Sequence, residues 1–196
     1  MIPFAVIVIG AAMLAQLFQH SMPSFATLHD ARVMIFPIIL AYGSLALPYP
    51  LVLAMAFCCG LLWDLLNLQV ITSTATLLKT PAIEIAVGTN VLLYGLYCTL
   101  MHGFRPLFLR GRWEVHTMLS GIFTAVMLLA EYFTLTLKRG GFELPSVIWW
   151  RSLTPAVVAL VLAPIVYLFF TLIAYLLGYP VREAPRESGG LLRGHY

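Results

Sequence analysis

Charged side chains are scarce in this sequence. Lys, Arg, Asp and Glu make up 10% of the 196 residues, against roughly 25% in an ordinary soluble domain. Most of the basic residues lie at the ends of apolar runs. This pattern suits membrane orientation better than a nucleic-acid-binding surface, which needs a dense basic face. Cysteine is also rare. Cys58, Cys59 and Cys98 all lie inside apolar runs, which predicts packing residues and neither a disulfide framework nor a cysteine metal site.

The motifs of common catalytic sites are missing as well. The sequence contains no G-x-S-x-G nucleophile elbow, no H-E-x-x-H pair and no glycine-rich phosphate loop. We therefore expect no enzymatic activity, no cofactor and no metal. The isolated histidines His102 and His116 are interpreted as polar caps near the membrane interface.

Apolar residues, in contrast, make up 61% of the chain. One compact core cannot bury this much apolar surface, and lipid is the solvent that accommodates the rest. We expect an all-α integral membrane protein, a bundle of about six transmembrane helices. Breaks at charged residues, Pro and Gly give six candidate spans: Ile2–Phe18, Val33–Ala46, Leu51–Leu66, Ile83–Met101, Val115–Leu137 and Ser152–Leu177.

The sequence also predicts how these spans are connected and where the transmembrane domain ends. Leu47-Pro48-Tyr49-Pro50 predicts a tight turn between the second and third spans, and Pro81 suits the first turn of the fourth. The first run has no preceding Lys or Arg, so we interpret it as a retained span and not as a signal peptide. Residues 1–178 are predicted to form the transmembrane domain, and residues 179–196 a mobile polar cytoplasmic tail.

Basic residues in the short loops predict the orientation. Arg105, Arg110 and Arg112 crowd one loop, and the tail adds three more arginines. With both of these segments in the cytoplasm, the N-terminus also lies inside. The predicted topology is N-in and C-in.

Three acids fall inside the predicted spans: Asp64, Glu84 and Glu131. An ionisable residue at a span centre costs roughly 2.5–3.5 kcal/mol on insertion scales, so it usually has a partner or a function. Alternating helix directions place all three acids near the outer leaflet, where Arg151 is a candidate counter-charge. Two interpretations remain open. The acids hold helix ends together, or they form a polar site for a ligand or a partner's helix.

Small and polar residues accompany each of these acids at helical spacing. We expect these faces to look into the bundle, because small residues let helices approach closely. The third span carries Ala56, Gly60, Asp64 and Asn67, the fourth carries Glu84, Gly88, Gly95, Cys98 and His102, and the fifth carries Thr117, Ser120, Gly121, Thr124, Glu131, Thr134 and Lys138.

The segment Gly60-Leu61-Leu62-Trp63-Asp64-Leu65 resembles the G-L-L-x-D-L signature of the MreD family of rod shape-determining membrane proteins. Asn90-Val91-Leu92-Leu93-Tyr94 resembles the next helix of that family, and the arginine-bearing loop follows it. The segments 67–81 and 138–150 depart from the family pattern. Gly60 and Asp64 are the motif residues that match.

The resemblance implies a non-enzymatic scaffold of the cell-elongation and peptidoglycan-synthesis machinery in the bacterial inner membrane. Its implied partners are MreC, MreB, RodA and the elongation-specific penicillin-binding protein. The outer-leaflet face around Asp64 and Glu131 would receive MreC, and the inner arginines would meet anionic lipid. The alternative is the substrate-binding subunit of an energy-coupling-factor type vitamin or metal transporter, which is similar in size and hydropathy.

Overall fold

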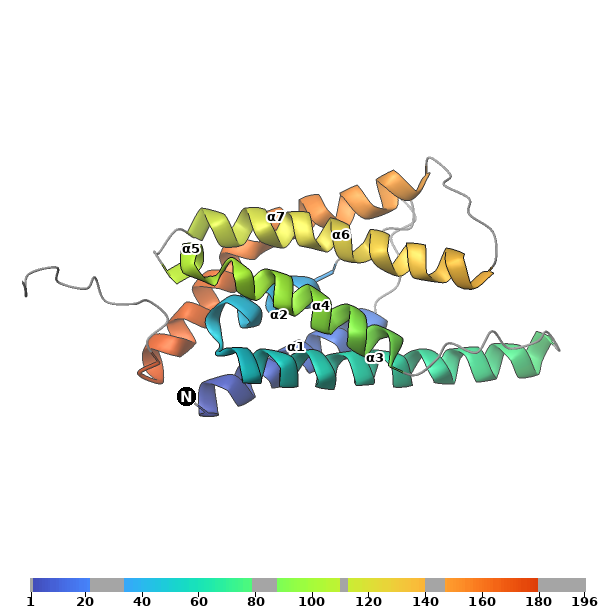
Figure 1. Cartoon of the computed structure of the whole chain (residues 1–196), viewed down its shortest axis with the longest axis horizontal. Helices are drawn as coiled ribbons and strands as arrows, with labels where there is room; N and C mark the ends of the chain where they lie inside the picture. The colour runs from blue at the N-terminus through green and yellow to red at the C-terminus, as the bar shows by residue number, and fades with distance from the viewer. Residues whose placement is uncertain (1, 22–33, 79–87, 110–112, 140–146, 180–196) are drawn as a thin grey trace, which may run out of the picture.

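The computed structural model describes residues 2–21, 34–78, 88–109, 113–139 and 147–179. These residues form seven helices and no strand, which confirms the all-α prediction for the described part of the chain. The helices are α1 (Ile2–Ser21), α2 (Phe36–Ala46), α3 (Tyr49–Leu78), α4 (Thr89–Gly103), α5 (Arg105–Leu109), α6 (Trp113–Arg139) and α7 (Val147–Leu176) (Figure 1).

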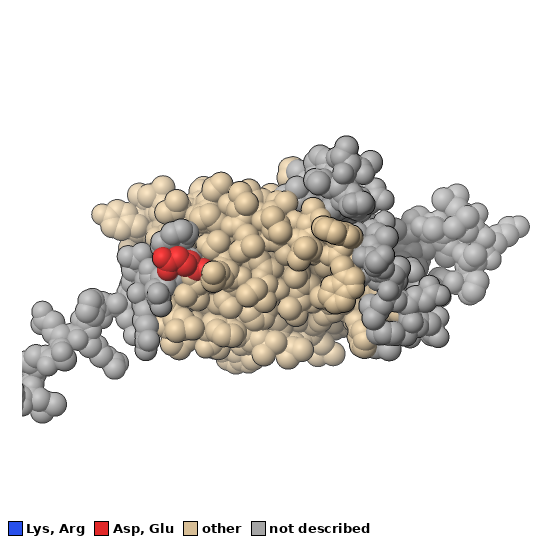
Figure 2. Space-filling model, turned by 90° about the horizontal axis from the view of Figure 1, so that it is seen from above, with Lys and Arg blue, Asp and Glu red and all other residues tan. Residues whose placement is uncertain are grey.

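Four of these helices contain segments long and apolar enough to cross a membrane: Ile2–Ser21, Tyr49–Asn67, Glu114–Thr134 and Ser152–Leu176. Their outward residues are apolar. The face of α7, for example, exposes Leu153, Val157, Val161, Ile165, Leu168 and Leu172. On the face that Figure 2 shows, the described residues form a surface without charged side chains except for acidic atoms close to one end. Such a surface suits lipid, because a water-soluble monomer rarely exposes large continuous apolar patches.

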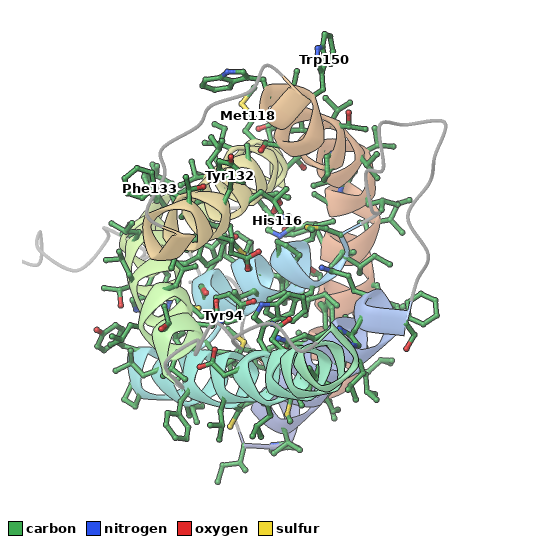
Figure 3. The ribbon with its side chains drawn as sticks, turned by 90° about the vertical axis from the view of Figure 1, so that its right-hand side faces the viewer. Tyr94, His116, Met118, Tyr132, Phe133 and Trp150 are labelled. Carbon is green, nitrogen blue, oxygen red and sulfur yellow. The ribbon has the colours of Figure 1, made fainter. Side chains whose placement is uncertain are left out.

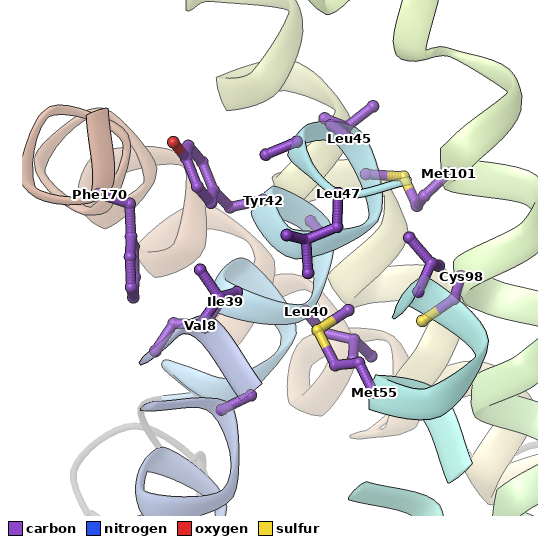
Figure 4. Close-up of a cluster of buried hydrophobic side chains, with 14 of the residues drawn as sticks. Val8, Ile39, Leu40, Tyr42, Leu45, Leu47, Met55, Cys98, Met101 and Phe170 are labelled. Carbon is purple, nitrogen blue, oxygen red and sulfur yellow. The ribbon is translucent and has the colours of Figure 1, made fainter. Parts of the chain in front are cut away.

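Helix α2 occupies the centre of the bundle. All of its 11 residues are buried, and it packs against each of the other six helices. Figure 3 shows α2 encircled by α1, α3, α4, α6 and α7. Its side chains fill the core together with residues such as Val8 of α1, Met55 of α3 and Phe170 of α7 (Figure 4). At about 1.5 Å per residue α2 extends roughly 16 Å, about half the hydrocarbon thickness.

The helix boundaries agree with the predicted spans in some places and differ in others. The turn at Pro48 is confirmed, since α2 ends at Ala46 and α3 begins at Tyr49. Helix α3 continues to Leu78, beyond the predicted end at Leu66, because no Gly or Pro interrupts it there. A continuous fourth span from Ile83 is wrong. Gly88 has a φ of 102°, which an α-helix does not accommodate, and α4 begins after it.

The predicted boundary of the polar tail needs a correction. Tyr179 is not part of a mobile tail, because its ring is buried and stacks on Phe4 at 4.6 Å. Its hydroxyl donates a hydrogen bond of 3.1 Å to the Ala46 carbonyl at the end of α2. Burial raises the pKa of the Tyr179 phenol, although Arg105 lies close enough to oppose the shift. The segment 180–196 lies outside the described residues.

Candidate functional site

The site begins where α3 and α4 touch at Gly60. A Cβ atom at this position would lie 2.5 Å from the Cα of Val91 and 2.8 Å from its backbone nitrogen. Real Cβ atoms do not approach a backbone this closely, so a residue without a side chain is required here. Gly60 therefore sets the distance between the two helices, as small residues do in membrane bundles.

Asp64 lies one helical turn after Gly60 and binds the beginning of α4. Its Oδ2 accepts a hydrogen bond of 2.6 Å from the Gly88 backbone N–H, and its Oδ1 accepts one of 2.6 Å from the Asn90 amide. The helix has no cap from its own N-cap residue, because that residue is Gly88. Asp64 supplies the cap from the neighbouring helix. A negatively charged group at a helix N-terminus is also favourable toward the helix dipole.

Glu131 of α6 meets the other side of α4. The Tyr94 hydroxyl donates a hydrogen bond of 3.3 Å to Glu131 Oε1. Because Asn90 and Tyr94 are one turn apart on α4, Asp64 and Glu131 lie at neighbouring levels of the bundle. Asp64 is 3% exposed, whereas Glu131 is only partly buried. Figure 3 shows the molecule from the end at which α4 begins, and Tyr94 is labelled there.

Helix α1 attaches to α3 close to this site. The Gln16 side-chain amide donates a hydrogen bond of 3.0 Å to the Cys59 carbonyl, next to Gly60. His20 lies edge-on to Trp63, with ring centroids 6.3 Å apart. Two consecutive turns of α3 therefore hold α1 on one side and α4 on the other.

The small-residue faces of α3 and α6 look inward at most of the described positions. Ala56, Gly60 and Asp64 are buried or in close contact on α3, and Ser120 and Thr124 are buried on α6. The space that Gly121 leaves on α6 is filled by Leu160 of α7, whose Cγ would lie 2.6 Å from an added Cβ.

Several predicted site residues have no described side chain. Glu84, Arg110 and Arg112 lie outside the described residues. Arg151 belongs to α7, but its side-chain environment is not described. Of the predicted basic loop, Arg105 begins α5 and is partly buried.

Sequence reasoning missed the residues that connect the two acids. Asn90 and Tyr94 were not predicted to be polar partners, although their one-turn spacing after Gly88 was a usable signal.

The two histidines that were predicted to be polar caps, His102 and His116, have different surroundings. The Nδ1 atom of His102 lies 2.8 Å from the Ser44 carbonyl near the end of α2, in agreement with a polar cap. His116 is fully buried, 5.7 Å from the Tyr42 ring, so its interpretation as an interfacial cap is wrong.

The chemistry of the site is that of a structural joint. Both oxygens of Asp64 already accept hydrogen bonds from the chain itself, so Asp64 has little capacity left for a ligand. Within the described part of the chain, no group of three His, Cys, Asp or Glu residues is placed to hold a metal ion. Glu131 differs from Asp64 because one of its oxygens has no hydrogen bond from the described residues.

Comparisons with protein-family models, with curated proteins and with solved structures found no match to this chain.

Proposed function

We propose that this chain is a non-enzymatic membrane scaffold of the MreD type, which acts in bacterial cell elongation from the inner membrane. The observation that supports the proposal is the joint between α3 and α4. The two residues that match the family signature, Gly60 and Asp64, both act in this joint: one permits the close approach and the other caps α4. In this proposal the signature residues have a physical role, because they fix the position of α4 against α3.

The proposed topology has six spans with both ends in the cytoplasm. The long helices account for four of them. The second and fourth would be the two shorter helices, α2 (Phe36–Ala46) and α4 (Thr89–Gly103). The ends of α3 and α6 and the start of α7 lie together at one end of the bundle (Figure 1), as this topology requires. Arg105, Arg110 and Arg112 would then lie on the cytoplasmic side, near anionic lipid and cytoplasmic partners.

The proposed direct partner is MreC, with MreB, RodA and the elongation-specific penicillin-binding protein as further members of the assembly. The two acids would contribute in different ways. Asp64 would act indirectly, because it is buried and holds α4 in place. Glu131 would contact the partner, because its side chain is less deeply buried than that of Asp64.

Co-purification of MreC from membranes tests this proposal. We expect the wild-type chain to capture MreC, and both Asp64→Ala and Glu131→Ala to reduce capture while the protein remains inserted. Asn67→Ala is the matched control, because the Asn67 amide donates a hydrogen bond to the Trp63 carbonyl of its own helix. Unchanged capture with both acid variants would contradict the contact. A small molecule that co-purifies tightly with the chain would instead favour the transporter subunit.

A further inference from the structure

A partly buried cation, Arg105, lies at the end of the bundle opposite to Asp64 and Glu131. It begins α5, directly after α4, whose 15 residues extend about 22 Å at about 1.5 Å per residue. Asp64 and Glu131 both bind residues in the first half of α4, so neither of them pairs with this cation. The Nε atom of Arg105 is buried and has no hydrogen-bond partner among the described residues. Leaving a buried donor without an acceptor costs free energy, especially when the donor is charged.

Arg105 belongs to the inward face of α5. It lies three residues before Phe108, so the two side chains are neighbours on one side of the helix. Phe108 is 3% exposed, whereas both residues between them are exposed. The Phe108 ring lies 5.9 Å from the ring of Tyr42 on α2 and 5.9 Å from the ring of Tyr167 on α7. The Arg105 side chain therefore extends along the face of α5 that meets α2 and α7.

Three hydroxyl groups lie in the same part of the bundle. The Tyr179 phenol is close enough to interact with the charge of Arg105. The Tyr42 hydroxyl lies near the hydroxyls of Thr171 and Tyr179, and Figure 4 shows the Tyr42 ring extending from α2 toward α7. Tyr179 already donates its hydrogen bond to the Ala46 carbonyl. The oxygens of Tyr42 and Thr171, in contrast, are buried without a hydrogen-bond partner in the described part of the chain.

Arg105, Tyr42 and Thr171 supply three of the six buried side-chain atoms that have no hydrogen-bond partner within the described ranges. All three groups can donate a hydrogen bond, and one of them carries a permanent positive charge. Such a set of donors is complementary to an oxyanion, and a guanidinium group in particular pairs well with phosphate oxygens. A water molecule would bridge the hydroxyls but would leave the charge of Arg105 unpaired.

The position of these donors is that of a bilayer's headgroup region. The membrane-spanning part of α7 ends at Leu176, and Tyr179 follows within one turn. Figure 1 shows α5 and the last part of α7 at the same end of the molecule. Arg105 and Thr171 are partly exposed, and α5 packs more extensively on α2, α4 and α6 than on α7. A phosphate group from the lipid therefore has a route to Arg105 between α5 and α7.

We propose that Arg105, together with the hydroxyls of Tyr42 and Thr171, binds the phosphate of an anionic phospholipid between α5 and α7. The guanidinium donates to the phosphate oxygens, and the two hydroxyls donate to the oxygen that faces the bundle. The bound lipid holds α5 against α7, two helices that contact each other little. This site goes beyond the proposed scaffold function, and it requires neither MreC nor a particular orientation in the membrane.

Native mass spectrometry of the purified full chain tests the proposal. The probes are phosphatidylglycerol, a diacylglycerol with the same acyl chains but no phosphate, and inorganic phosphate. We expect the wild type to retain phosphatidylglycerol and not the diacylglycerol. Arg105→Gln should retain about tenfold less phosphatidylglycerol, as expected for the loss of a hydrogen bond to a charged group. Arg139→Gln is the matched control, because it removes one positive charge at the other end of α6.

Tyr42→Phe and Thr171→Val distinguish lipid binding from folding. In detergent without lipid, both variants should unfold at the wild-type temperature or above it, because each removes a buried hydroxyl that has no partner. Phosphatidylglycerol should raise the unfolding temperature of the wild type, since a ligand stabilises the folded state that binds it. The same lipid should stabilise both variants less.

Equal retention of phosphatidylglycerol by the wild type and Arg105→Gln would overturn the proposal, and so would an equal loss in Arg139→Gln. Binding of inorganic phosphate with no retention of phosphatidylglycerol would contradict a lipid as the source of the phosphate. Failure of MreC capture with normal lipid retention would contradict the proposed scaffold partner and leave the lipid site supported.

Discussion

Replacing Gly60 with alanine is expected to destabilise the protein by about 1–3 kcal/mol, the usual cost of forcing extra atoms into a packed contact. The added Cβ would meet the Val91 backbone at 2.5 Å. A backbone cannot rotate away as a side chain does, so α4 must move away from α3. That movement also lengthens both hydrogen bonds of Asp64. The measurement is the thermal unfolding midpoint of the purified protein in one fixed detergent.

Gly95→Ala is the matched control for this variant. Gly95 lies in the middle of α4, as Gly60 lies within α3, but an added Cβ would meet nothing within 4 Å. Alanine is preferred over glycine in a helix by about 1 kcal/mol, so this variant should be as stable as the wild type or slightly more stable. If both variants unfold at the wild-type temperature, α3 and α4 do not approach as closely at Gly60 as described.

The second large effect is expected for Asp64→Ala, which should destabilise the protein by about 2–4 kcal/mol. The substitution removes the acceptor of the Gly88 N–H and of the Asn90 amide. Both donors then remain partly buried without these hydrogen bonds, and the start of α4 loses its cap. Hydrogen exchange of the first turn of α4 should accelerate more than exchange in α6 or α7.

Asp64→Asn tests the hydrogen bonds of the cap separately from the packing of the side chain, because asparagine fills nearly the same space as aspartate. Its amide oxygen still accepts one of the two hydrogen bonds, while its amide nitrogen faces the other donor. We expect a stability between those of the wild type and Asp64→Ala. Asn67→Ala, one turn along α3, should change stability far less, because its hydrogen bond lies within its own helix. Equal stability of Asp64→Ala and wild type would show that Asp64 is not the cap.

The parts of the fold that depend on local pattern were predictable. The scarcity of charge and the long apolar runs predict helices with lipid-facing surfaces, and the two prolines around Tyr49 predict the turn before α3. Small residues at spacings of three and four along α3 and α6 predict inward faces, because these positions lie on one side of a helix. The same spacing placed Gly60 and Asp64 together.

Other features depend on contacts between distant parts of the chain. Helix α2 has the composition of a span. Its bounds show that it is short, and its packing against the other six described helices shows that it is central. Tyr179 belongs to a polar sequence, but its partners Phe4 and Ala46 are far away in the chain. Gly88 could be read as an ordinary helical glycine, since a positive φ leaves no direct sign in the sequence.

Cysteine labelling of intact cells tests the central claim. The claim is that the helices form a membrane-embedded bundle in which Asp64 and Glu131 lie near the outer leaflet. Single cysteines replace Ser24, Glu143, Gly111 or Ser188 after the native cysteines have been removed, and a membrane-impermeant maleimide is applied from outside. We predict that positions 24 and 143 are labelled in intact cells, whereas positions 111 and 188 are labelled only after the membrane is opened. Labelling of all four positions in intact cells, or protection of positions 24 and 143, would contradict the claim.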